Sequence, residues 1–393
     1  MTMGARLGVV AKKSPGDLIR ERAGQWLAAL VGICVFFISA AFQSGNNLGV
    51  AAAFEAFYDK KYVIAGLLIV FNAVAISFLF AFKDLYRLIE RLMTILVAVM
   101  LISFTVNLVN LKPNVVDAAK GFIPSLAEID IDLLGLIGTT FVITAAFYQA
   151  YLVRQKGWGI DDMKNGIIDA RVGSIIMAVI TLVLMSTAAA GLYTGEEIKL
   201  KSPVQIAVAL EATFGTQGKV IFCLGLFSAA YSSFLVNSMI GGFMAADGLR
   251  LGSSPNDKGP RILTTIALLS GLCVALAVII FDFDKTPTII AAQAVTVVGA
   301  PLIAGVLLWL TSRKDIMGDH VNGTFTKVAG GIGLVLLITM AGRTAAKVKD
   351  YLDPPAAVES ASIPTRSVSE GESHEVAESP PIHGPTGQSQ VSP

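Results

Sequence analysis

The sequence predicts an all-α, polytopic membrane protein. The chain has 393 residues, of which 54% are hydrophobic and 15% are charged, and its mean hydropathy is +0.68. A soluble protein of this length carries about 25% charged residues. Apolar runs recur along the chain, and several exceed the roughly 20 residues that a helix needs to cross a bilayer. The lipid bilayer is therefore an expected partner.

Nine transmembrane helices are expected. They cover residues 25–57, 63–82, 92–111, 133–154, 172–194, 219–246, 262–281, 287–312 and 325–342. The first is long enough to be tilted, broken or partly interfacial. Residues 1–24 are expected to form a cytoplasmic N-terminal segment, and residues 25–349 the transmembrane domain. Residues 350–393 are rich in Pro, Ser and Glu with almost nothing to bury, which predicts a disordered polar tail.

The distribution of Lys and Arg predicts the orientation. The segments 1–24, 83–91, 154–171, 250–261 and 313–327 hold 18 of these cations, whereas the segments 58–62, 112–132, 195–219 and 282–286 hold 8. Short loops rich in Lys and Arg stay in the cytoplasm. The first set is therefore expected inside, in a multi-pass protein of the plasma (inner) membrane, and nine spans place the tail outside. No secretory signal peptide is expected.

Composition also argues against several function classes. The net charge of +1 argues against a nucleic-acid partner. The cysteines form no CxxC pair, and the histidines fall outside the predicted spans, so zinc and disulfides are not expected. These residues are Cys34, Cys223, Cys273, His320, His374 and His383. No pairing of a nucleophile with a base accompanies them. The sequence therefore predicts neither an enzyme nor a bound cofactor.

One predicted span carries an unusual number of polar groups. In "GTTFVITAAFYQAYLVRQKG", Thr140, Thr144, Tyr148 and Tyr151 share one stripe at 100° per residue. The hydroxyls could bond to preceding carbonyls and join helices together. Alternatively, the stripe lines a pathway, with a broken helix whose freed carbonyls coordinate a cation. No Pro or Gly follows Thr139 before the end of the span, which counts against a break.

A second polar block lies in the first span, in "FFISAAFQSGNNLGVAAAF". Gln43, Ser44, Gly45, Asn46 and Asn47 are consecutive, so together they wrap around the helix. Such a block must meet protein or water, because lipid cannot satisfy it. A cavity wall is favoured over packing alone. Asp, Glu and His are absent from mid-depth in the predicted spans, where an ionisable group would indicate function.

Four further stretches carry a family resemblance. They are "GARLGVVAKKSPGDLIRE", "AAKGFIPSL", "LGLFSAAYSS" and "AAQAVTVVGAPLIAGVLLWLTSRKDIMGDHVN". Over roughly residues 4–342 the chain resembles the Nramp family of divalent metal-ion transporters. The resemblance implies a LeuT-type inverted-repeat fold. The predicted spans would be the third to eleventh helices, so the fold is expected to be N-terminally incomplete. An in-frame extension of roughly 50–80 residues is expected upstream of Met1.

The resemblance also implies a substrate site. Val142, Ile143, Thr144 and Ala145 stand where the sixth helix of the family carries Met-Pro-His-Asn, so the thioether that favours Mn²⁺ or Fe²⁺ over Mg²⁺ is missing. Gln43 and Asn46 replace acids tied to proton movement, Gln149 replaces a second His, and Gln293 is retained. The family also carries two paired cationic side chains on its ninth helix. Arg261 corresponds to one of them, and Pro260 replaces the other.

Two sets of candidate residues follow. The metal or substrate candidates are Thr139, Thr144, Gln149 and Gln293. The candidates for lining the pathway are Gln43, Asn46, Asn47, Thr140, Tyr148 and Arg261. Their hydroxyl and amide oxygens suit a hard, still hydrated cation. The divalent cation would be the transported substrate.

The sequence leaves three functions open. The favoured one is transport of divalent metal ions of the Mn and Fe type, shifted toward harder ions such as Mg²⁺, by alternating access. A non-transporting Nramp-like sensor or scaffold is a second, although the tail of 44 residues is too short for a signalling domain. Transport of an uncharged solute is a third, since the predicted site has lost its charges.

Overall fold

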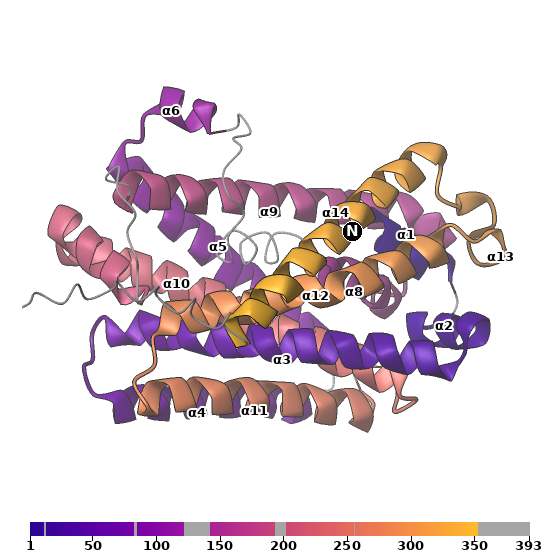
Figure 1. Cartoon of the computed structure of the whole chain (residues 1–393), viewed down its shortest axis with the longest axis horizontal. Coiled ribbons are helices and arrows are strands. Elements are labelled where there is room, and N and C mark those ends of the chain that lie inside the picture. The colour runs from indigo at the N-terminus through magenta and orange to yellow at the C-terminus, as the bar shows by residue number, and fades with distance from the viewer. Residues whose placement is uncertain (12, 82–84, 122–141, 193–201, 255, 353–393) are drawn as a thin grey trace, which may run out of the picture. The chain divides into compact units, whose positions relative to one another are not determined.

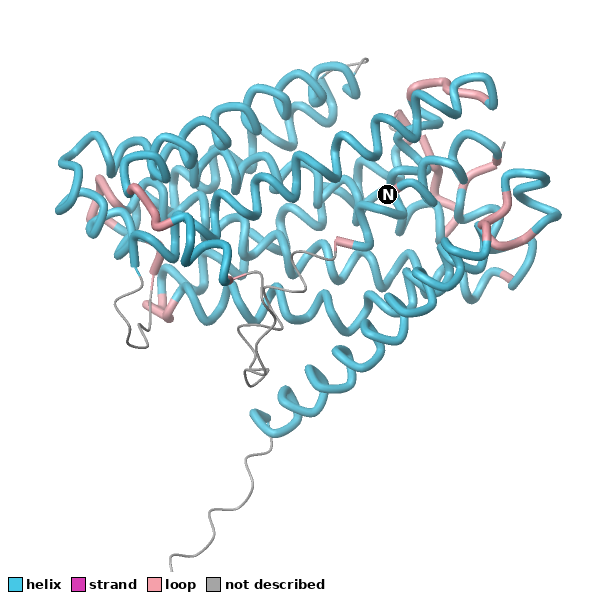
Figure 2. The backbone as a smooth tube through the Cα atoms, turned by 90° about the horizontal axis from the view of Figure 1, so that it is seen from above, coloured by secondary structure: helices cyan, strands magenta, loops and turns pink. Residues whose placement is uncertain are grey.

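The computed structural model describes residues 1–11, 13–81, 85–121, 142–192, 202–254 and 256–352. The secondary-structure elements within these ranges are all helices, joined by loops, as Figure 2 shows. Eight helices are long and apolar enough to cross a membrane: Gln25–Glu55, Lys61–Ala81, Arg91–Leu111, Ile160–Ala190, Gly215–Gly248, Lys258–Ile280, Lys285–Thr311 and Thr324–Ala346. They confirm eight of the nine predicted spans and the all-α membrane class. The remaining span, 133–154, is described only from Val142 onward.

The helices follow one another along the chain in the following order. They are α1 (Thr2–Val10), α2 (Pro15–Ala23), α3 (Gln25–Glu55), α4 (Lys61–Ala81), α5 (Leu85–Leu111), α6 (Val115–Lys120), α8 (Ile143–Gln155), η1 (Ile160–Asp162), α9 (Met163–Leu192), α10 (Val204–Gly248), α11 (Lys258–Ile280), α12 (Lys285–Thr311), α13 (Lys314–Met317), η2 (Gly318–His320) and α14 (Thr324–Leu352). Within α10, Gly215 has a φ of 68° and marks a kink. One compact unit extends from Met1 to Lys349.

The chain just before the first long span is helical for local reasons. Ser14 is the N-cap of α2, and its hydroxyl accepts a hydrogen bond from the backbone N–H of Asp17. Pro15 follows at the first helical position, where a missing N–H costs nothing. The helix ends at Gly24, whose φ is 91°. The predicted N-terminal segment therefore contains two helices, α1 and α2, and both pack on longer ones.

A first set of helices is built around α3. This helix packs against α10, α11, α12 and α4, and α10 in turn packs against α11 and α5. In Figure 1, α3 runs between α12 on one side and the pair α4 and α11 on the other. The α2 helix packs on α3 and α10 and so belongs to this set.

A second, smaller set consists of α1, α8 and α9. The α1 helix packs on both α8 and α9. Gly4 and Gly8 of α1 lie directly against the backbone of Ala146 and Ala150 of α8, as is typical of close helix packing in membranes. This set also touches α12 and α10, and α9 lies against α5.

Polar contacts tie the loops together at the two ends of the helices. At one end Arg6 donates to the carbonyl of His320 at 3.0 Å, and Arg22 pairs with Asp315 at 3.0 Å. These contacts join the predicted cytoplasmic segments 1–24 and 313–327.

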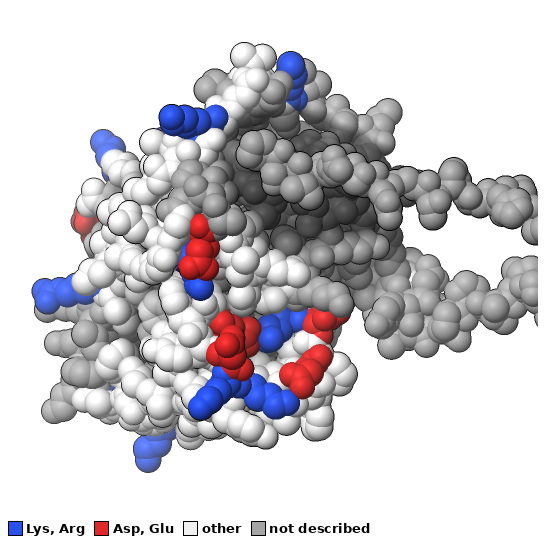
Figure 3. All heavy atoms as spheres, turned by 90° about the vertical axis from the view of Figure 1, so that its left-hand side faces the viewer, with Lys and Arg blue, Asp and Glu red and all other residues white. Residues whose placement is uncertain are grey.

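At the other end the pairs are Lys61 with Asp282 at 3.0 Å and Lys285 with Glu55 at 3.2 Å. The first pair joins the predicted external segments 58–62 and 282–286, and the second joins segment 282–286 to the last residue of α3. Figure 3 looks at this end, where acidic and basic side chains lie side by side. These four segments therefore meet in the pairs that the distribution of Lys and Arg predicts.

Candidate cation pathway

The amide block of α3 forms a ladder of hydrogen bonds. The Nδ2 of Asn46 donates to Oε1 of Gln43 at 3.4 Å, and the Nδ2 of Asn47 donates to the backbone carbonyl of Gln43 at 2.8 Å. The ladder continues to α4, because the Nδ2 of Asn72 donates to Oδ1 of Asn47 at 2.8 Å. All four side chains are buried. The block therefore meets protein and not lipid, as the sequence requires.

The same ladder holds polar atoms without a partner among the described residues. They are the Nε2 of Gln43 and the Oδ1 of Asn72, both fully buried. Buried polar atoms in native proteins are almost always satisfied by protein, water or ligand. Helix packing explains Asn47, which bridges α3 and α4. It does not explain these two atoms, so the cavity wall predicted from the sequence stays a prediction.

Gln293 of α12 approaches the block from another side of α3. A Cβ built on Gly45 would lie 3.0 Å from the Nε2 of Gln293, so the amide rests directly on the α3 backbone. The Oε1 of Gln293 is buried, and it has no hydrogen-bond partner in the described part of the chain. At 100° per residue, Gly45 and Gln43 point in nearly opposite directions. Gln293 and the Gln43 ladder thus lie on different faces of one helix.

The polar helix α8 starts later than its sequence suggests. Val142 has a ψ of 71°, which is not helical, and the helix begins at Ile143. The sequence left open whether this helix is broken, and the backbone departs from helical geometry at Val142 although no Pro or Gly marks the position. Thr144 lies buried in the first turn. Thr139 and Thr140 fall outside the described residues. The residues aligned with the helix break of the family thus stand at a helix start.

Tyr148 and Gln149 face different neighbours. The ring of Tyr148 stacks on Tyr151, with ring centroids 5.6 Å apart, and meets Phe243 of α10 edge-on at 6.0 Å. Gln149 lies toward α1 and α9 instead, where its Nε2 donates to Oδ2 of Asp169 at 3.5 Å. Tyr148 therefore packs between α8 and α10. Gln149 connects α8 to α1 and α9, within the second set of helices.

Arg261 is turned toward a loop. Its guanidinium donates to Oδ1 of Asn256 at 2.9 Å, in an exposed position at the start of α11. Gly271 of the same helix packs against Gln43. Ten residues of helix separate these positions by about 15 Å. Arg261 thus lies at the end of α11, far along the helix axis from the amide ladder.

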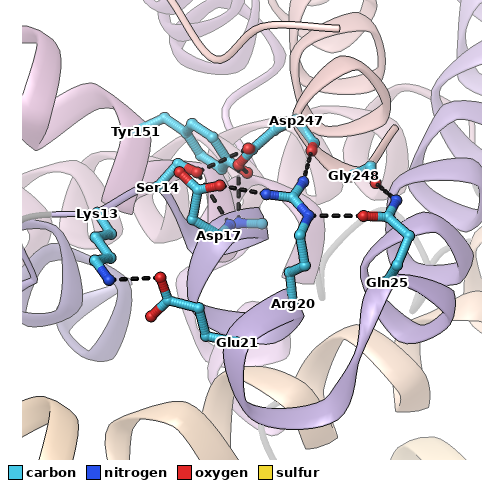
Figure 4. Close-up of polar contacts among 10 residues, drawn as sticks. Lys13, Ser14, Asp17, Arg20, Glu21, Gln25, Tyr151, Asp247 and Gly248 are labelled. Carbon is cyan, nitrogen blue, oxygen red and sulfur yellow. Dashed lines mark hydrogen bonds and ion pairs between the residues drawn. The ribbon is translucent and has the colours of Figure 1, made fainter. Parts of the chain in front are cut away.

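A cluster around Asp247 is absent from the sequence-derived candidates. Asp247 is in the last turn of α10 and is only 3% exposed. Its Oδ1 accepts from the hydroxyl of Ser14 at 2.7 Å, and its Oδ2 accepts from the backbone N–H of Gly16 at 2.8 Å and from the hydroxyl of Tyr151 at 2.6 Å. Figure 4 shows these donors converging from α2 and α8.

The start of α2 is shaped to receive this carboxylate. The N-terminal N–H groups of a helix carry partial positive charge and stabilise an anion. A Cβ on Gly16 would lie 2.5 Å from the Cγ of Asp247, so only glycine permits this approach. Arg20 donates to the carbonyl of Asp247 at 2.7 Å, and Gln25 donates to that of Gly248 at 2.8 Å. These two bonds satisfy carbonyls that the end of α10 leaves open.

Sequence signals for this cluster exist but do not pair its members. Asp247 is an acid at the end of a long apolar run, and Ser14 with Pro15 is a helix-start signature. Neither signal says that the two meet. Elsewhere among the described residues, no group of three or more His, Cys, Asp or Glu side chains is arranged to hold a metal ion. The side chains of the α3 ladder and of Gln293 are amides, which carry no charge.

Comparisons with known proteins agree with this architecture. The family model described as natural resistance-associated macrophage protein-like, Nramp, matches residues 1–346. The divalent metal cation transporter MntH of Pectobacterium carotovorum is 23% identical over 348 residues, which cover 86% of this chain and 81% of that protein. Metal transporter Nramp2 of Oryza sativa is 25% identical over 365 residues, which cover 86% of this chain and 67% of that protein.

Solved structures show the same fold. A variant of the Eremococcus coleocola manganese transporter superposes with a TM-score of 0.70 at 17% sequence identity, covering 91% of this chain and 79% of that one. The same transporter bound to an aromatic bis-isothiourea compound also gives 0.70, at 18% identity and with 90% and 79% covered. This likeness confirms the LeuT-type fold. Since the family model spans nearly all of the described helices, the chain belongs to the Nramp family.

Proposed function

We propose that the protein is a secondary transporter of divalent cations that works by alternating access in the plasma membrane. Family membership over residues 1–346 supports this proposal, as do relatives that are named divalent metal cation transporters. The division of the helices into two sets supports the mechanism, because one set can rock against the other around a site between them.

The observation that carries the choice of site is the buried amide of Gln293. Its Oε1 is a buried oxygen with no partner among the described residues, and its Nε2 lies against α3 at Gly45. Thr144 lies at the start of α8, a helix that packs on α12 as well as α1. In this proposal these oxygens, with those of the stretch containing Thr139, contact the cation. Gln149 contributes indirectly, through α1 and α9.

The donor set determines the proposed preference. Hard cations such as Mg²⁺ take oxygen ligands and keep several waters, whereas a thioether favours Mn²⁺ or Fe²⁺. Val142 supplies no sulfur at the position where the family has its Met. A site made of only a few neutral oxygens holds a cation weakly, so in this proposal the transported ion stays partly hydrated. We infer a preference shifted from Mn²⁺ toward Mg²⁺.

Competition uptake into proteoliposomes tests this function. Liposomes that contain the protein should accumulate Mn²⁺ and Mg²⁺ above the level of protein-free liposomes. Gln293→Leu keeps the side-chain size but removes the oxygen, and it should lower uptake of both ions roughly tenfold, the effect of about 1.4 kcal/mol. Gln217→Leu is the matched control, because Gln217 is exposed on α10. Full activity in Gln293→Leu would place the substrate elsewhere.

The neutral ladder of α3 favours one alternative, an uncharged solute. That substrate would need hydrogen-bond donors and acceptors such as the unpartnered amide atoms of Gln43 and Asn72. If well-folded protein in sealed liposomes takes up no divalent ion, that result would favour this alternative or the function of a sensor or scaffold.

A further inference from the structure

The bond between Tyr151 and Asp247 crosses from one set of helices to the other. Tyr151 belongs to α8, which packs chiefly on α1, while α1 packs on α9. Asp247 belongs to α10, which packs on α3, α11 and α5. This hydrogen bond lies at the end of the helices where segment 1–24 contacts segment 313–327. Lys and Arg in the loops predict that this end is cytoplasmic.

The remaining bonds of Asp247 stay within the first set. Ser14 and Gly16 belong to the start of α2, and α2 packs on α3 and α10. Arg20 and Gln25 further fasten α2 to the last carbonyls of α10. When the two sets separate, α2 therefore stays with Asp247, and the bond that must break is the one from Tyr151.

We propose that Ser14, Gly16, Tyr151 and Asp247 form an inner latch, which holds the cytoplasmic ends of the two helix sets together and opens when the cation is released inside. This inference rests on the proposed alternating-access function.

The chemistry of the inner latch suits repeated opening. A buried carboxylate that loses its only partner is strongly destabilising. Asp247 loses only one of three donors, because Ser14 and the N–H of Gly16 remain bonded to it. The cost of opening is then that of a single hydrogen bond to a charged group. Tyr151 can in turn bond to water that enters the opened gap.

A conservative variant isolates the crossing bond. Tyr151→Phe removes the hydroxyl alone and keeps the ring that stacks on Tyr148. The matched control is Tyr231→Phe, since the hydroxyl of Tyr231 donates to the carbonyl of Phe71 at 3.4 Å and both residues belong to the first set. Asp247→Asn is a stronger variant, but it also weakens the seating of α2 and is therefore secondary.

Distances between spin labels measure the state of the inner latch without any substrate. Labels are attached to cysteines introduced at Asn165 in α9 and Lys258 in α11, both exposed, after replacement of Cys34, Cys223 and Cys273. The protein is reconstituted in lipid nanodiscs. Tyr151→Phe should raise the ratio of long to short distances roughly tenfold, as loss of one such bond implies. Tyr231→Phe should leave the ratio unchanged.

Each outcome decides the inference. An unchanged distribution in Tyr151→Phe would overturn the inner latch, even if uptake changed. An equal shift in both variants would also overturn it, because the effect would then be a general loss of packing. A shift confined to Tyr151→Phe in protein that transports nothing would support the inner latch and refute the proposed function.

Discussion

Gly45 of α3 and Gln293 of α12 lie in direct contact, with a Cβ at Gly45 placed only 3.0 Å from the Nε2 of Gln293. The missing side chain lets the amide approach the α3 backbone closely, with its Oε1 buried. Gly45 belongs to the polar block identified in the sequence. It provides no polar side chain, but its lack of a side chain leaves room for the Gln293 amide.

Gly45→Ala should lower cation uptake by displacing the Gln293 amide. A methyl group 3.0 Å from Nε2 is too close, so the amide must shift away from its present position. Alanine favours the helix by about 1 kcal/mol over glycine, so the fold should tolerate the change. We expect the KM for Mn²⁺ and Mg²⁺ to rise roughly tenfold.

The control for this variant is Gly66→Ala. Gly66 is in α4 and is exposed, and a Cβ added to it would meet no atom within 4 Å. Initial uptake rates in proteoliposomes at several ion concentrations give both KM values. Equal KM values in the two variants would show that Gly45 does not position Gln293.

Val142→Met should move the ion preference back toward softer metals. Val142 is the N-cap of α8, at the position where the resemblance places the Met of the family. A thioether there is a poor ligand for Mg²⁺ and an adequate one for Mn²⁺ and Cd²⁺. Uptake of these two ions relative to Mg²⁺ should rise, by roughly three- to tenfold.

Competition uptake measures this ratio. Val172→Met is the control, because Val172 is 48% exposed on α9. An unchanged ion ranking in Val142→Met would mean that the start of α8 does not face the substrate. The hydroxyls of that helix would then serve only to hold helices together.

Hydropathy predicted the long helices well, because about 20 apolar residues in a row have few alternatives to crossing a membrane. It could not predict the start of α8 at Ile143, since Val142 leaves the helical region without a Gly or Pro to announce it. Periodicity correctly grouped Tyr148 and Tyr151 on one face. It could not say that this face meets α10, because a period identifies a face and not its neighbour.

The inner latch escaped prediction for a related reason. Gly16 and Asp247 are 231 positions apart, and their contact depends on which helix ends meet in space. In the sequence alone, Asp247 looks like an acid at a membrane interface. Only the fold shows that it is buried and receives three donors.

Asn322→Ala should destabilise the protein. Asn322 lies in an Asn-Gly-Thr sequence that matches a glycosylation site, but it is buried. Its Nδ2 donates to the hydroxyl of Thr311 at 2.7 Å, and its Oδ1 accepts from Arg6 at 2.7 Å. Loss of these bonds leaves buried groups unpaired, at a cost of about 1–3 kcal/mol.

Thermal unfolding in detergent measures this cost. The control is Asn165→Ala, since Asn165 is exposed and makes one long hydrogen bond to Asp162. The midpoint should fall for Asn322→Ala and stay within error for Asn165→Ala. Attachment of a glycan to Asn322 in folded protein would contradict the burial on which the prediction rests.

Cation uptake should not acidify the liposome interior. A proton relay needs ionisable groups inside the membrane. In the α3 block of this chain, Gln43 and Asn46 stand where the resemblance places acids, and both are neutral amides. Asp247 is an acid, but it lies in the last turn of α10 and already accepts three hydrogen bonds. A cation gradient should therefore drive uptake without proton entry.

Liposomes loaded with a pH-sensitive dye measure this directly. An inward Mn²⁺ gradient is imposed while K⁺ and valinomycin hold the membrane potential, and dye fluorescence is followed beside Mn²⁺ uptake. We expect uptake with no change in internal pH beyond that of protein-free liposomes. Acidification that requires both the protein and the metal would show that a proton carrier exists. Acidification that persists in Asp247→Asn would exclude Asp247 as that carrier.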